Sequence, residues 1–122
     1  MKGTELMKGN WVSYLGVNKR VSQIGPDNQV RFFGKNKVIV SDDELEPILL
    51  TEEILEQNGF KKEGPAPQGV QVWSIIVNEK RFRLFEWVAS QSFGLSDFPI
   101  KFVHEFQNTL QLLKVEKEIV LP

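Results

Sequence analysis

Hydrophobic and polar positions alternate over short stretches of the first fifty residues, which predicts a series of β-strands. Glycine, proline and asparagine separate these stretches and are typical of turns. The expected strands are Asn10–Leu15, Lys19–Ile24, Val30–Phe33, Val38–Val40 and a closing strand at Glu46–Leu50. A single helical turn at Ser41–Leu45, capped by Ser41 or Asp42, precedes the closing strand. This order of elements predicts a small SH3-like β-barrel.

A short helix is expected directly after the barrel. Thr51 is a good N-cap, and the two glutamates behind it favour the positive end of a helix. Gly59 is typical of a left-handed C-cap, with Phe60 folding back as the hydrophobic contact of that motif. A helix of about eight residues is too short to be stable alone, so we expect it to pack on a neighbour.

Proline and glycine gather in Lys61–Gly69, which we interpret as the boundary between two halves, 1–60 and 61–122, of one compact unit. Val70–Val77 and Lys80–Val88 then predict a long antiparallel hairpin that turns at Asn78-Glu79. The second strand alternates. Phe82, Leu84 and Val88 are expected on one face, and Arg81, Arg83, Phe85 and Trp87 on the other.

The main helix is expected in the last third of the chain, with Ser96 or Asp97 as its cap and Pro99 in its first turn. At 100° per residue its apolar side chains share one arc: Phe102, Val103, Phe106, Leu110 and Leu113. We expect Phe102, Phe106 and Leu110 to be buried, and the tail Val115–Pro122 to add a last strand. The predicted fold class is α+β: an N-terminal SH3-like barrel, a short helix, and an antiparallel β-hairpin packed by one longer C-terminal helix.

Composition excludes several chemistries. The 122 residues contain no cysteine and one histidine. Disulfides, thiolate catalysis and cysteine-bound metals are therefore excluded, and so is a two-histidine metal site within one chain. Phosphate-binding glycine loops and serine-hydrolase elbows are absent from the sequence, so we expect no catalytic residues, metal or cofactor. The sequence contains neither an apolar stretch long enough for a membrane span nor a signal peptide, and a cytoplasmic location is expected.

Charge is unevenly distributed although the net charge is only −1. Residues 1–41 hold seven basic and two acidic side chains, whereas residues 42–63 hold two basic and eight acidic ones. The basic set of the predicted barrel is Lys19, Arg20, Arg31, Lys35 and Lys37. Together with nearby aromatic residues it could bind single-stranded nucleic acid if the charges converge on one face. The alternative is that the aromatics fill the barrel and the lysines keep its edges soluble.

The single histidine lies on the polar face of the predicted main helix, with Gln107, Asn108 and Gln111. His104 has no nucleophile or carboxylate in a recognisable catalytic pattern, since its neighbours one turn away are carboxamides. We therefore expect His104 near the surface with an ordinary titration. These four side chains can donate and accept several hydrogen bonds, so they form a candidate recognition stripe.

Three stretches carry a resemblance to a known family: Lys8-Gly9-Asn10-Trp11-Val12, then Leu45–Leu55 with Asn58-Gly59-Phe60, and Ile100–Asn108. In this order, over nearly the whole chain, the sequence resembles a family of short uncharacterised proteins of gut Bacteroidetes, often encoded among prophage or mobile-element genes. The resemblance implies a class of protein and no mechanism.

The function hypothesis is a non-enzymatic protein-interaction module, possibly an accessory protein of a phage or mobile element, with an unidentified protein partner. Its candidate binding residues are His104, Gln107, Asn108, Arg81, Arg83 and Trp87. Arginine and tryptophan are enriched where proteins meet, which favours the strand face as a partner surface. The alternative is nucleic-acid binding through the basic barrel. The least favoured hypothesis is an enzyme that uses His104 as a general acid or base. Oligomeric state stays open.

Overall fold

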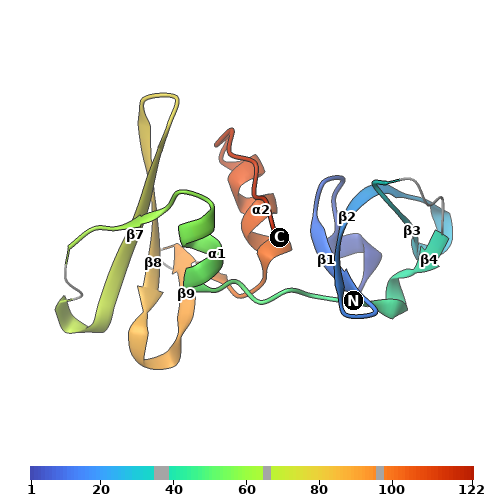
Figure 1. Ribbon diagram of the computed structural model, residues 1–122, viewed down its shortest axis with the longest axis horizontal. Helices are drawn as coiled ribbons and strands as arrows, with labels where there is room; N and C mark the ends of the chain where they lie inside the picture. Colours follow the sequence, from blue (N-terminus) through green and yellow to red (C-terminus); the bar gives the residue numbers. More distant parts are fainter. Residues whose placement is uncertain (35–38, 65–66, 96–97) are drawn as a thin grey trace.

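The computed structural model describes residues 1–34, 39–64, 67–95 and 98–122, and it shows two antiparallel sheets with two α-helices between and beside them (Figure 1). The α+β class is thereby confirmed. The first sheet lies at one end of the long axis and the second at the other. Helix α2 and the C-terminus lie between them (Figure 1).

The first sheet is a curled half-barrel in the order β4-β3-β2-β1-β5. Its strands are β1 Trp11–Tyr14, β2 Val17–Ile24, β3 Gln29–Phe32, β4 Ile39–Ser41 and β5 Leu45–Glu46. Short 3-10 turns cover Gly3–Glu5, Pro26–Asn28 and Asp42–Glu44. The inner face buries a small cluster: Leu6, Val12, Val21, Val30, Val40 and Leu45.

The first hairpin turns one residue earlier than predicted. Leu15 and Gly16 both have positive φ, at 51° and 77°, and β2 already begins at Val17. Two left-handed residues match the right-handed twist of the flanking strands, which is why such two-residue turns are favoured. The helical turn at Asp42–Glu44 is confirmed: the Ser41 Oγ accepts from the Asp43 backbone N–H, and the Ser41 N–H donates to the Glu44 carboxylate.

The predicted closing strand at Glu46–Leu50 is mostly wrong. Only Leu45 and Glu46 pair with β1. Pro47 offers no backbone N–H, and residues 48–50 turn to the second half of the chain instead. There the Leu50 N–H donates to the Lys101 carbonyl, and the Val103 N–H donates to the Ile48 carbonyl.

The short helix α1, Glu52–Gln57, forms as its caps predict. The Thr51 hydroxyl accepts from the Ile54 N–H. At the other end Gly59 adopts φ 85°, and the Phe60 N–H donates to the Leu55 carbonyl at 3.0 Å. Leu55 and Phe60 are both buried, so the helix is held by packing rather than by its own length.

The second sheet has the order β10-β9-β8-β7-β6. Its strands are β6 Lys61–Lys62, β7 Val70–Val77, β8 Lys80–Trp87, β9 Ser92–Leu95 and β10 Phe98–Ile100. The predicted long hairpin is confirmed in full register from Val70↔Trp87 to Val77↔Lys80. The sequence analysis predicts neither β9 nor β10, and it places Pro99 of β10 in the first turn of the main helix.

Helix α2 spans Val103–Leu112 and starts later than predicted. Ser96 and Asp97, the predicted caps, lie outside the described residues, and Pro99 lies in edge strand β10. Proline lacks a donor and is tolerated at such an edge. The actual N-terminal contact comes from Glu105, whose Oε1 accepts from the backbone N–H groups of Lys101 and Phe102.

The buried hydrophobic residues form two clusters. Those up to Leu45 belong to the first cluster, and those from Leu50 onward, ahead of α1, belong to the second. Leu55 and Phe60 of the short helix belong to the second core. That larger core also holds Trp73, Leu84, Phe93, Ile100, Val103, Phe106 and Leu110.

Burial of the main helix is confirmed for Phe106 and Leu110, while Phe102 is half-buried and Leu113 is exposed. The bounds of the helix explain the difference, since Phe102 precedes its first residue and Leu113 follows its last. The tail 115–122 adds no strand among the described residues, yet it buries Ile119 and Leu121 in the second core.

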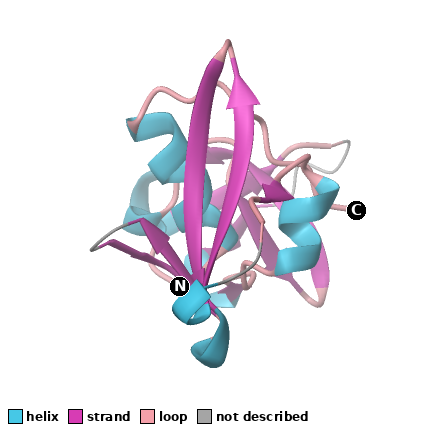
Figure 2. Ribbon diagram, turned by 90° about the vertical axis from the view of Figure 1, so that its left-hand side faces the viewer, coloured by secondary structure: helices cyan, strands magenta, loops and turns pink. Residues whose placement is uncertain are grey.

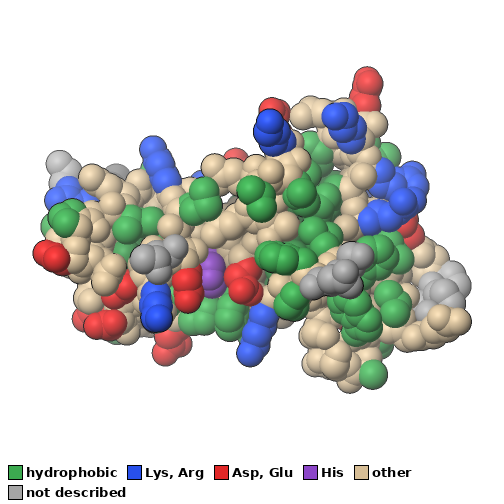
Figure 3. All heavy atoms as spheres, turned by 180° about the vertical axis from the view of Figure 1, so that it is seen from behind, with side chains coloured by type: hydrophobic (Ala, Val, Ile, Leu, Met, Phe, Trp, Pro, Cys, Tyr) green, Lys and Arg blue, Asp and Glu red, His purple; other side chains and the backbone are tan. Residues whose placement is uncertain are grey.

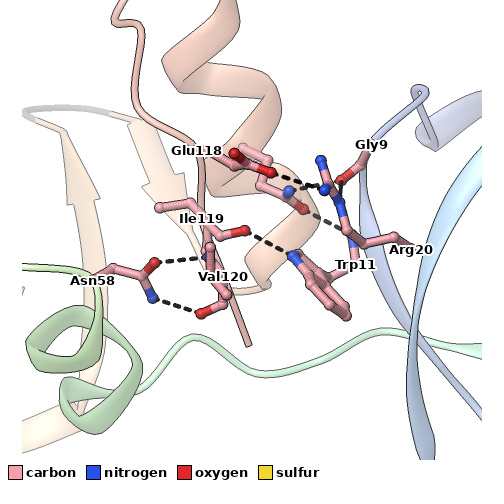
Figure 4. Close-up of polar contacts among 8 residues, drawn as sticks. Gly9, Trp11, Arg20, Asn58, Glu118, Ile119 and Val120 are labelled. Atoms are coloured by element: carbon pink, nitrogen blue, oxygen red, sulfur yellow. Dashed lines mark hydrogen bonds and ion pairs between the residues drawn. The ribbon is translucent and has the colours of Figure 1, made fainter. Parts of the chain in front are cut away.

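Polar contacts join the two halves (Figure 4). The Trp11 indole N–H donates to the Ile119 carbonyl at 2.8 Å, and Arg20 pairs with Glu118 at 2.8 Å. Asn58 holds the same tail from the other side, since its carboxamide bonds to both the N–H and the carbonyl of Val120. The tail is thus fastened between the first sheet and the end of α1. No described helix is long and apolar enough to cross a membrane.

Candidate functional site

The outer face of the second sheet gathers the residues predicted as a partner surface. Arg81, Arg83, Phe85 and Trp87 alternate along β8 with the buried Leu84 and Glu86. The register places Ile76, Ser74, Val72 and Val70 of β7 directly across from them. Figure 2 shows the two long strands in front, with no described helix over them. We call this uncovered surface the outer face.

The two arginines of the outer face are held in place by one carboxylate. Glu63 contacts the Arg81 Nη1 at 3.2 Å and the Arg83 Nε at 3.0 Å. The hydrogen bond from Arg83 holds the pKa of Glu63 below its ordinary value, with the charges of Arg83 and Arg81 adding to the effect. Both guanidinium groups are half exposed, so each keeps donors for another acceptor.

The indole of Trp87 packs close to Gly94, where the absence of a side chain leaves room for it. A Cβ at Gly94 would come within 3.1 Å of the indole Cζ3 and 2.8 Å of the Phe98 carbonyl. The indole keeps 37% of its surface exposed. Figure 3 shows hydrophobic side chains gathered over the part of the molecule that contains the second sheet, with basic side chains at its outer end.

The residues His104, Gln107, Asn108 and Gln111 do not form one free stripe, and the expected surface position of His104 is wrong. His104 is 3% exposed and stacks on Phe102 at 5.8 Å between ring centroids. It faces Glu5 at 3.9 Å, which is too long for a hydrogen bond. Its Nδ1 has no partner among the residues that the structure describes.

The carboxamides of this stripe fasten the helix to the first half. The Gln107 Oε1 accepts from the Trp11 N–H, and its Nε2 donates to the Gly9 carbonyl. Asn108 bonds to the Asn10 side chain and to the Glu5 carbonyl. Gln111 alone stays exposed. Periodicity identified the polar face correctly, but a second layer of structure covers it.

The expected titration of His104 is also corrected. Burial disfavours the imidazolium and lowers the pKa of His104 below its ordinary value, while the charges of Glu105 and Glu5 oppose the shift. The unfolded chain therefore binds more protons than the folded one just below pH ~6.5. It follows that the stability contributed by neutral His104 is complete above pH ~6.5. This stability is lost as the pH falls from there through the lower pKa that His104 has in the folded protein.

We expect the free energy of unfolding to decrease more steeply between pH 7 and pH 5 in the unaltered chain than in His104→Gln, because glutamine at position 104 does not titrate. Urea unfolding at several pH values measures both slopes, and the carboxylates common to both chains cancel in the comparison. Equal slopes would contradict a lowered pKa for His104.

The basic residues of the first sheet do not share one face. Lys19 pairs with the buried Val12, while Arg20 pairs with Trp11 on the opposite side of the strand. Arg20 is already engaged by Glu118 and lies over the rings of Trp11 and Phe33. Arg31 is exposed on β3, and Lys35 and Lys37 lie outside the described residues. Lys19 and Arg20 thus lie on opposite faces of β2, and nucleic-acid binding through the basic barrel stays a prediction.

Sequence reasoning missed a cavity on the inner side of the second sheet. It measures about 590 Å³ and lies between the segment 49–52, the end of β8, and strands β9 and β10. Glu86 lines it although the residue is only 4% exposed. The sequence contains the signal for it. Glu86 lies two residues after Leu84 and four after Phe82, so the alternation of the strand places its carboxylate on the core face.

Comparisons with protein-family models, with curated proteins and with solved structures found no match, so the arrangement of these residues carries the functional argument.

Proposed function

We propose that this chain is a non-enzymatic protein-interaction module that binds its partner through the outer face of the second sheet. The observation that carries the proposal is the uncovered combination of Trp87 and Phe85 with two oriented arginines on one strand. Tryptophan and arginine are the residues most often found at the energetic centre of interfaces. The sheet supplies a rigid base for them.

The chemistry of this surface favours a partner segment with apolar side chains flanked by a carboxylate. Ile76 is 63% exposed and, with Trp87, offers apolar contact area. Arg81 and Arg83 together carry two positive charges against the one negative charge of Glu63, so the group attracts an acidic side chain. A guanidinium binds a carboxylate through two parallel hydrogen bonds, which adds geometric selectivity.

The position of His104 supports a non-enzymatic role. A general acid or base must reach a substrate, and this imidazole is enclosed between Phe102 and the N-terminal segment. The carboxamides beside it are occupied in hydrogen bonds within the chain.

Two finer hypotheses belong to the same proposal. We regard the first sheet as an SH3-like module, because β5 returns to β1 after a 3-10 turn. We also keep the hypothesis of a phage or mobile-element accessory protein, which depends on the resemblance of the three stretches named above.

The proposal is tested by selecting peptides from a random display library on the immobilised chain. We expect the selected peptides to combine apolar and acidic residues, and Trp87→Ala to weaken their binding at least about tenfold. Arg83→Ala is expected to weaken the acidic peptides more than their uncharged variants, because only the former use the guanidinium.

Leu15→Ala is the matched control, since Leu15 is 82% exposed at a hairpin of the first sheet. It should leave binding unchanged. Peptides that bind Trp87→Ala and Arg83→Ala as well as the unaltered chain would refute the outer face as the docking surface.

A further inference from the structure

The cavity beside Glu86 combines mostly apolar walls with a buried polar side chain. Leu49, Leu50, Phe93, Pro99 and Ile100 supply the apolar walls, and Thr51, Ser90 and Ser92 add hydroxyl groups. A volume of about 590 Å³ falls in the range of small-molecule sites, which are mostly apolar with a few placed polar groups. Glu52, Gln91 and Lys101 also line the cavity, and the buried polar group among its lining residues is the Glu86 carboxylate.

Glu86 is held rigidly by a buried indole. Its Oε1 accepts from the Trp73 Nε1 at 2.9 Å, and Trp73 is fully buried. The bond fixes the carboxylate plane and uses one acceptor oxygen. The second oxygen, Oε2, has no hydrogen-bond donor among the residues that the structure describes.

The carboxylate also lacks an ion-pair partner within the described part of the chain. Lys62 is the nearby cation: the hydrogen bond to Glu52 is the main cause that raises the pKa of Lys62, and the charge of Glu86 adds to it. The Lys62 Nζ is bonded to the Glu52 carboxylate at 2.9 Å and lies 5.3 Å from the centre of the Trp73 ring, so it makes no ion pair with Glu86. Lys101 lines the cavity, but its Nζ lies over the Phe102 ring. A buried carboxylate is costly unless a positive charge accompanies it.

We infer that the cavity binds an organic cation, a primary amine on an apolar body, with the ammonium group on Glu86 and the body against Phe93 and Ile100. An anion would be repelled by Glu86, and a neutral apolar molecule would leave the carboxylate without a donor. A metal ion is a poorer candidate because hard cations require several converging oxygens, and no such group exists among the described residues. This site uses the inner face of β8 and is independent of the outer face.

The test compares 2-phenylethylamine with 2-phenylethanol, which has nearly the same shape but no charge. Both are titrated into the ¹⁵N-labelled chain of 122 residues and followed by two-dimensional NMR. We expect saturable shifts of the Trp73 indole resonance and of the Phe93 and Ile100 amides with the amine. The alcohol should bind at least tenfold more weakly.

Glu86→Gln is the variant that isolates the charge, because the glutamine oxygen can still accept from the Trp73 indole. It should weaken amine binding at least tenfold, while Leu15→Ala on the exposed hairpin of the first sheet should not change it. The site is refuted by equal binding of amine and alcohol, or by shifts confined to residues outside the cavity. The comparison of the two probes uses the unaltered chain and decides the question even if Glu86→Gln fails to fold.

Discussion

Replacing Phe106 with alanine is expected to lower the free energy of unfolding by about 3–5 kcal/mol. Phe106 is completely buried on the inward side of α2. Its ring packs against Phe60 at 5.5 Å and Phe82 at 6.4 Å between centroids, so it joins the short helix and the long hairpin. Truncation removes the transfer energy of the ring and leaves a cavity that rigid neighbours cannot close.

Leu112→Ala is the matched control on the same helix, because that side chain is 80% exposed. Its effect should stay within about 0.5 kcal/mol. Urea unfolding followed by tryptophan fluorescence measures both variants. Similar losses for Phe106→Ala and Leu112→Ala would mean that the inward face of α2 is wrongly assigned.

Gln107→Ala is expected to cost about 2 kcal/mol, the largest effect we predict for a polar residue. The carboxamide bonds to the Trp11 N–H at 2.8 Å and to the Gly9 carbonyl at 2.9 Å. Its removal leaves the partly buried Trp11 N–H without its partner, whereas the Gly9 carbonyl keeps only the longer bond from Arg20 Nε at 3.3 Å. Each such group costs about 1–3 kcal/mol when it stays dry, and less where water reaches it. The cost arises at the contact between α2 and the first sheet.

Gln111→Ala removes the same side chain one turn later on the same helix, where it is exposed. We expect an effect below about 0.5 kcal/mol. Amide hydrogen exchange adds a local test, because the Trp11 amide should lose protection in Gln107→Ala. If Gln107→Ala and Gln111→Ala were equally stable, the carboxamide would not fasten the two halves.

Strand β8 explains how one segment can carry two separate binding surfaces. Its side chains alternate between the outer face, with Arg83 and Trp87, and the inner face, with Leu84 and Glu86. The proposed peptide surface and the proposed amine cavity therefore differ by one residue in sequence and lie on opposite sides of the sheet. Variants on the two faces should act independently, because their side chains share no partner.

Local sequence signals determined the elements whose structure depends on near neighbours. The caps of α1 are set by Thr51 and Gly59. The hairpin turn at Asn78-Glu79 has positive φ at both residues, 51° and 68°, and asparagine is a residue that favours this conformation. The alternation in β8 placed Arg81, Arg83 and Trp87 together on one face. These features require only the order of residues along the chain.

Tertiary structure decided which polar faces are free. The stripe of His104, Gln107 and Asn108 is polar by helical periodicity, yet the segment 5–11 covers it and uses its hydrogen bonds. The start of α2 was also decided at long range, since residues 101–103 first pair with 48–50 before the helix begins. Burial and pairing depend on what another part of the chain places opposite, and periodicity within one segment carries no information about that partner.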